Sequence, residues 1–347
     1  MGQRKEIGWL NFLKGIAIMA VVFDHMHKFL YQSEYLWSLS FYSVTLFTFV
    51  AGITSCLSME KRMRLDCYDL AYTWKRLKKI LIPYAVATAF YVFAKNQFFD
   101  FKTYLEALVT FSGAAPFYFI VYFVQLIVAA PLLFLVIYKI KRKSLHVLFL
   151  IGTAVFSGLC LKFTYIIKTW GGGQYLLGST YFLIFVLGIY CWKNRNVLKR
   201  PKINLYFLIV GLVGISAFLV FNLLQYKKLT NPPGLLIMLY TFCIFACVFS
   251  GYYFLEKKAK NWKIRPAKYI EKIGHYSMDI FLYHLLLIMI FKKVGAVLHF
   301  DKNIIYAVAV YIIAIGLPII TRIIYTKIYQ WLFNKETIMT VLVKNKS

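Results

Sequence analysis

The chain has 347 residues, of which 61% are hydrophobic, 19% aromatic and only 16% charged, and its formal net charge is +28. Soluble domains carry about 25% charged residues, so this composition excludes an ordinary soluble protein and indicates an integral membrane protein. The positive charge does not indicate a nucleic-acid partner. Lys and Arg gather in short clusters between apolar segments, whereas a nucleic-acid binder gathers them on one folded face.

A membrane-spanning helix needs about 20 mostly apolar residues. The sequence contains about ten such segments, at residues 10–31, 38–58, 79–95, 116–138, 145–163, 176–192, 204–224, 234–255, 277–291 and 304–332. The third contains Pro83 and the ninth is short. No other stretch is long and polar enough to form a soluble domain. We therefore expect residues 1–347 to form one all-α domain, a polytopic bundle of about ten transmembrane helices.

The basic clusters orient this bundle. With the N-terminus inside, they fall into the inner loops, at Lys61–Lys79, Lys139–Lys143, Lys193–Lys202 and Lys257–Lys272. Short loops rich in Lys and Arg are typical of the cytoplasmic side, where they also meet anionic membrane lipids. We predict that both termini are cytoplasmic. The pair Lys292 and Lys293 falls on the outer side, an exception that a re-entrant ninth segment would explain.

The first apolar segment carries Lys14, Asp24 and His25. Ionisable groups at membrane depth are costly unless they are paired or face a wet cavity. Lys14 and His25 are three helical turns apart with about 20° left over, so they share a face at about 16 Å axial separation. A neutral imidazole is a suitable general base near pH 7. Asp24 points about 100° away, where it either orients that imidazole or pairs with Lys28.

Five stretches, taken in order, resemble membrane acyltransferase family 3. FLKGIAIMAVVFDH (12–25) resembles the family's first span, in which a basic residue and a histidine are separated by ten residues. Lys14 and His25 have this spacing, and LKGI is the form of members similar to fucose 4-O-acetylases. The other stretches are FTFVAGITSCLSMEKR (47–62), WKRLKKILIPY (74–84), PFYFIVYFVQLIVAAPLL (116–133) and IGHYSMDIFLYHLLL (273–287). Departures from the family pattern are Ala51 for serine, Phe281 for tyrosine, and Phe-Tyr for Trp-Phe at 117–118.

The resemblance implies an O-acyltransferase, most simply an O-acetyltransferase, of the bacterial cell membrane. It would move an acyl group from acetyl-CoA or another acyl-CoA to a hydroxyl of a surface glycan or a lipid-linked carbohydrate precursor. His25 would be the base, assisted by Lys14 and Asp24. A phosphate site for the CoA moiety is expected from Lys14 and the basic patch of Lys75, Arg76, Lys78 and Lys79. Contacts to the acceptor are expected from His284, Tyr283, Tyr118 and Gln125. No metal site is predicted, because the six cysteines lack ligand spacing.

Three alternatives remain open at this stage. A transporter or flippase for a glycan or lipid-linked substrate would also need wet intramembrane charges. In a second class of membrane acyltransferase, the histidine of a late span is the base, so that His284 would replace His25 in that role. A non-catalytic membrane scaffold would need neither histidine.

Overall fold

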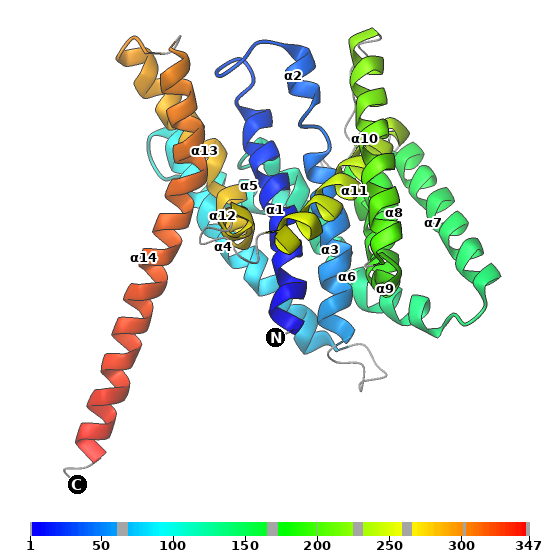
Figure 1. The fold of residues 1–347 in the computed structure, drawn as a ribbon. Coiled ribbons are helices and arrows are strands. Elements are labelled where there is room, and N and C mark those ends of the chain that lie inside the picture. Colours follow the sequence, from blue (N-terminus) through cyan, green and yellow to red (C-terminus); the bar gives the residue numbers. More distant parts are fainter. Residues whose placement is uncertain are drawn as a thin grey trace.

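The computed structural model describes residues 2–60, 69–164, 173–198, 200–224, 232–258, 266–300 and 303–344. Within these ranges the protein is built of helices and has no β-strand (Figure 1). The helices are α1 (Gly2–His25), α2 (Glu34–Ser38), α3 (Ser43–Glu60), α4 (Leu70–Asn96), α5 (Phe101–Thr110), α6 (Tyr118–Lys139), α7 (Lys143–Thr164), α8 (Thr180–Lys193), α9 (Arg195–Leu198), α10 (Pro201–Leu224), α11 (Leu235–Lys258), α12 (Pro266–His275), α13 (Ser277–Val297) and α14 (Ile304–Lys344). The 3₁₀ turns η1 (Ala115–Phe117) and η2 (Gly173–Gly178) precede α6 and α8.

Each of the ten predicted segments coincides with one of these helices, and the predicted all-α polytopic fold is confirmed. Among the described residues, 8 helices are long and apolar enough to cross a membrane, and α8 is a shorter apolar helix. Helix α4 continues through Pro83 without a break. Helix α13 reaches Val297 and has 21 residues, so the ninth segment is a continuous helix of spanning length. The expectation of a short or re-entrant segment was wrong, because the helix absorbs Lys292 and Lys293.

Helix α1 lies at the centre of the bundle and contacts α3, α11, α12, α13 and α14. Its most extensive contact is with α12, a short amphipathic helix that lies outside the ten predicted apolar segments. The two backbones touch at glycines. A Cβ at Gly274 would lie 1.7 Å from the Asn11 carbonyl oxygen, and one at Gly15 would lie 2.3 Å from that of Ile270. Only Tyr276 separates α12 from α13, so this contact fixes where α13 begins relative to α1.

A second close crossing joins α3 to α8. A Cβ at Gly52 would lie 2.1 Å from the Phe185 carbonyl oxygen, and one at Gly188 would lie 2.2 Å from that of Phe49. Small residues drive helix association in membranes, because they let backbones approach within van der Waals contact where hydrophobic burial gives no advantage. Helices α1, α3 and α13 therefore form a closely packed centre, and α7 and α10 lie at its periphery with mostly exposed surfaces.

Helix α14 is unusually long. Its 41 residues amount to about 61 Å of helix, roughly twice the hydrocarbon thickness of a bilayer. Figure 1 shows its C-terminal part projecting beyond the other helices, toward the same end of the bundle as the first turn of α1. Termini at one end would agree with an even number of crossings, and the count of about ten stays a prediction. That this end is cytoplasmic stays a prediction, and residues 61–68, 199 and 259–265 of the predicted basic loops lie outside the described residues.

Candidate active site

A cavity of about 580 Å³ opens at the end of the bundle where α3 ends and where α4 and α13 begin. We call it the basic cavity, because its polar lining includes Lys14 from α1 and Lys75, Arg76 and Lys79 from α4. Thr54, Ser58, Tyr72 and Ser277 add hydroxyl groups. Among the described residues that line the cavity there is no Asp or Glu. Four cationic side chains with no Asp or Glu among the described lining residues make a site for a polyanion.

The guanidinium group of Arg76 has one nitrogen without a hydrogen-bond acceptor among the described residues. Its Nη2 donates to the Ser55 hydroxyl at 2.8 Å, and its face lies over the Tyr72 ring, 5.8 Å from the centroid. The Tyr72 hydroxyl is in turn hydrogen-bonded to that of Ser58. By contrast, Nη1 of Arg76 is buried and has no hydrogen-bond partner among the described residues. A buried unsatisfied donor on a charged group is costly, and an anionic ligand in the cavity would satisfy it.

The histidines that the sequence placed in separate segments lie together. The ring of His25, the last residue of α1, is 5.1 Å from the ring of His284 on α13, centroid to centroid, with a tilt of 42°. His284 is fully buried. Its Nδ1 donates to the backbone oxygens of Ile280 at 3.0 Å and Phe281 at 2.8 Å. The two histidines thus form one imidazole pair, and which of them is the base stays a prediction.

Two phenylalanines form an aromatic wall of the basic cavity, and one of them, Phe281, also lies beside the imidazole pair. Phe281 and Phe119 line the cavity, and their rings are 5.1 Å apart. The Phe281 ring is also 6.1 Å from the His284 ring. Neither His25 nor His284 lines the cavity itself. The shared face of Lys14 and His25 therefore leads from the cavity, past an aromatic wall, to the imidazoles.

Asp24 faces the segment between α2 and α3. The Ser40 hydroxyl donates to its carboxylate at 2.9 Å. No ion pair joins Asp24 to Lys28 among the described residues, and Lys28 adopts a positive φ of 65° in the turn after α1. Next to it, the His27 ring stacks on the Trp37 ring at 4.6 Å. Asp24 thus anchors the segment that closes over the end of α1, and a direct role in orienting His25 stays a prediction.

The remaining predicted site residues lie outside the cavity lining. The ammonium group of Lys78 rests over the Trp74 ring, 5.4 Å from its centroid. Tyr283 packs against Phe90 at 6.2 Å, and Tyr118 packs against Tyr122 at 6.4 Å. Lys75, Arg76 and Lys79 therefore face the cavity from successive turns of α4, and Lys78 does not.

Gln125 is occupied by backbone groups. Its Oε1 accepts the Leu177 N–H at 2.6 Å, and its Nε2 donates to the Val121 carbonyl at 3.2 Å. This amide ties η2 to α6, so both of its ends already have partners. One N–H of Nε2 and one lone pair of Oε1 remain, and the predicted contact with an acceptor sugar stays a prediction.

Sequence reasoning missed several residues of the site. Ser55 and Ser58 were visible in the stretch 47–62 but offered no signal, because serine is common near helix ends. Phe281 was noted only as a departure from the family pattern, and Phe119 lies in the stretch 116–133 without a signal of its own. Ser40 could be connected to Asp24 only through the folded chain, since the intervening segment has no regular pattern.

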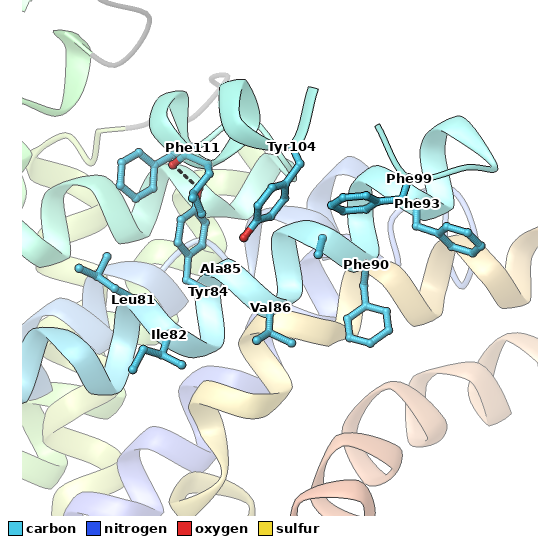
Figure 2. Close-up of a pocket in the computed structure, with 12 residues that line it drawn as sticks. Leu81, Ile82, Tyr84, Ala85, Val86, Phe90, Phe93, Phe99, Tyr104 and Phe111 are labelled. Carbon is cyan, nitrogen blue, oxygen red and sulfur yellow. Dashed lines mark hydrogen bonds between the residues drawn. The ribbon is translucent and has the colours of Figure 1, made fainter. Parts of the chain in front are cut away.

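A larger cavity of about 810 Å³ lies elsewhere, between α4 and α5. Figure 2 shows that aromatic side chains of both helices, Phe90, Phe93 and Tyr104 among them, line it. The Tyr84 hydroxyl donates to the Ala107 and Leu108 carbonyls. No charged side chain occurs among its described lining residues, so this groove does not offer acid–base chemistry.

Helix α5 beside the groove is capped by Asp100, whose carboxylate accepts the N–H groups of Lys102 and Thr103. The hydrogen bond from the Thr103 hydroxyl, and after it the one from the Thr103 N–H, hold the pKa of Asp100 below its usual value.

Among the described residues there is no cluster of three or more His, Cys, Asp or Glu that could hold a metal ion.

Comparison with known proteins gives one match. Residues 7–323 match the model of the family described as acyltransferase domain, family 3 of the membrane acyltransferases. Searches of curated proteins and of solved structures give no match. The matched range contains the basic cavity and both imidazoles and extends into α14. The chain therefore belongs to membrane acyltransferase family 3.

Proposed function

We propose that this acyltransferase is an O-acyltransferase, and most simply an O-acetyltransferase. It would take the acyl group from acyl-CoA and transfer it to a hydroxyl of a cell-surface glycan or a lipid-linked precursor. The observation that carries the proposal is the basic cavity, which brings Lys14 together with Lys75, Arg76 and Lys79 next to an imidazole pair. Membership of the family favours acyl transfer over the transporter alternative.

The cavity suits the donor by charge. The CoA moiety carries a pyrophosphate and a further phosphate, and three basic groups of α4 line the cavity. Phosphate groups bind well to arginine through paired N–H donors, and the unsatisfied Nη1 of Arg76 offers one. Lys14 lies on α1 on the path between the mouth and His25, where its ammonium group would hold a phosphate or polarise the thioester carbonyl.

The chemistry would be carried by His25. Its unprotonated ring nitrogen takes the proton of the acceptor hydroxyl as the oxygen attacks the thioester carbonyl carbon. The carbon–sulfur bond then breaks, and the proton on His25 passes to the departing CoA sulfur. The products are an ester and free CoA, and His25 returns to its starting state. The thioester would approach His25 past Phe281, because this ring lines the cavity and lies 6.1 Å from the His284 ring.

The acceptor, the acetyl group and a bacterial plasma membrane follow from the resemblance of the motifs. Tyr118, Tyr283 and Gln125 remain candidates for acceptor contacts on that basis. The segment between α1 and α3 carries the stacked rings of His27 and Trp37, aromatic faces of the kind on which a sugar stacks.

The test uses the full-length protein purified into lipid nanodiscs and radiolabelled acetyl-CoA. His25→Ala is expected to abolish acyl transfer and its counterpart His299→Ala, an exposed loop histidine, is expected to leave it unchanged. Mass spectrometry of surface glycans from cells with and without the protein would identify the acceptor and the acyl group together. A well-folded His25→Ala protein that transfers acyl groups at the wild-type rate would disprove the role of His25.

A further inference from the structure

His284 has an arrangement that its packing alone does not explain. Its side chain is fully buried, yet its Nε2 has no hydrogen-bond partner among the described residues. Buried polar atoms are nearly always paired, and each exception calls for an explanation. The ring that faces His284 is that of His25. A nitrogen kept unpaired beside the proposed base points to a task in the reaction.

The hydrogen bonds of His284 fix its tautomer. The two groups within reach of Nδ1 are the carbonyl oxygens of Ile280 and Phe281, and carbonyl oxygens can only accept. Nδ1 must therefore carry the hydrogen. A buried imidazole without a counter-ion is neutral, and a neutral imidazole has only one N–H. Nε2 of His284 thus holds a lone pair and acts as a fixed acceptor.

The ring separation suits a bond between the two histidines. A hydrogen bond of roughly 2.9 Å between two ring nitrogens would place the ring centres roughly 5 Å apart, and the observed separation is 5.1 Å. In the structure the rings are tilted by 42° and the bond is not made. A rotation of the His25 ring about its side-chain bonds would bring one of its N–H groups to Nε2 of His284.

We propose that His284 is a positioning residue for His25. Its Nε2 accepts an N–H from His25, and this holds the other nitrogen of His25 unprotonated and directed at the acceptor hydroxyl. The same bond stabilises the imidazolium that forms when His25 takes the proton. The inference rests on the proposed function, since it assigns His284 the part that a carboxylate has in a Ser-His-Asp triad. The backbone bonds of Nδ1 keep the acceptor in place without a charge at membrane depth.

Two substitutions separate this role from a structural one. His284→Gln can place an amide oxygen close to the position of Nε2, so the acceptor toward His25 is kept and the backbone bonds of Nδ1 are lost. His284→Asn can place an amide N–H close to the position of Nδ1, so the backbone bonds are kept and the acceptor is lost. Positioning predicts that the Gln variant is the more active, and a purely structural role predicts the opposite order.

The measurements are kcat and KM for acetyl-CoA in nanodiscs, with thermal unfolding as the check on folding. We expect His284→Asn to lower kcat by roughly 10²-fold or more, by analogy with loss of the orienting group in a triad, at nearly unchanged KM. His284→Gln is expected to recover most of that loss.

The outcomes distinguish the two proposals. If His25→Ala is inactive and the Asn variant is as active as the Gln variant or more so, the positioning role is overturned and the proposed function stands. If His25→Ala retains activity while His284→Ala is inactive, His284 is itself the base and the assignment of His25 fails with the inference. If both alanine variants are fully active, the proposed function fails at this site.

Discussion

The glycine contact between α1 and α12 gives a prediction that can be worked from the structure. Gly274→Ala adds one methyl group, and its carbon would lie 1.7 Å from the carbonyl oxygen of Asn11 and 2.6 Å from the nitrogen of Gly15. Close carbon–oxygen contacts between helices are about 3.3 Å or longer. The two backbones must therefore separate by roughly 1.6 Å, because no rotatable side chain can yield in their place.

The separation affects both stability and activity. Overpacking a tight site costs about 1–3 kcal/mol, of which the better helix propensity of alanine recovers at most about 1 kcal/mol. The shift is passed to α13, because only Tyr276 lies between α12 and α13. Displacements of about 1 Å at reacting groups lower rates by roughly 10²-fold. We expect a similar loss of kcat as His284 moves relative to His25.

The assay compares thermal unfolding and acetyl-CoA turnover of the variant in nanodiscs. Gly251→Ala on α11 is the matched control, since an added methyl group there meets nothing within 4 Å, and it should match the wild type in both measurements. Wild-type turnover and an unchanged melting temperature in Gly274→Ala would refute the reasoning, because the helices would then tolerate the separation without moving the imidazoles.

Three further predictions concern the basic cavity and its wall. Arg76→Gln should raise KM for acetyl-CoA by roughly 10-fold to 100-fold and weaken the dependence of KM on salt, because a hydrogen bond to a charged group contributes about 1.5–3 kcal/mol. Lys78→Ala should leave KM unchanged, and equal effects of the two variants would show that α4 acts only through its net charge. Phe281→Ala should increase acceptor-independent hydrolysis of acetyl-CoA, measured as free thiol, because it opens the wall between cavity and imidazoles; unchanged hydrolysis would mean that the wall does not control access. Ser40→Ala should lower kcat only modestly and leave KM for acetyl-CoA unchanged, because Asp24 loses one hydrogen bond. A loss of activity as large as that of His25→Ala would place Asp24 in the chemical step.

The helices could be predicted from the sequence, because a membrane-spanning helix is recognised by the length and apolar content of its segment. The shared face of Lys14 and His25 was also accessible, since helical phase is set by the spacing of residues. Where a segment is short and amphipathic the same reasoning fails. Helix α12 carries Lys268, Glu271 and Lys272, a composition that indicates a basic loop. In the structure it is the helix that packs most extensively on α1.

The site itself was predictable only in part. Arg76 and Lys78 are two residues apart in one basic cluster, and their different surroundings depend on which face of α4 meets the cavity. The meeting of His25 with His284 depends on how α13 is placed against α1, and glycine contacts set that placement. No periodicity in the sequence encodes a contact between helices so distant in the chain. The sequence therefore predicts both histidines for the site but not that their rings lie next to each other.

The length of α14 has a practical consequence for experiments in living cells. The apolar segment predicted from the sequence ends near residue 332, and the helix continues to Lys344, which adds about 18 Å of helical stalk. A fluorescent reporter fused beyond this stalk would be held clear of the lipid surface and away from the bundle. Its brightness would then report which compartment receives the C-terminus, and a reporter that matures only in the cytosol would directly test the orientation of the whole chain.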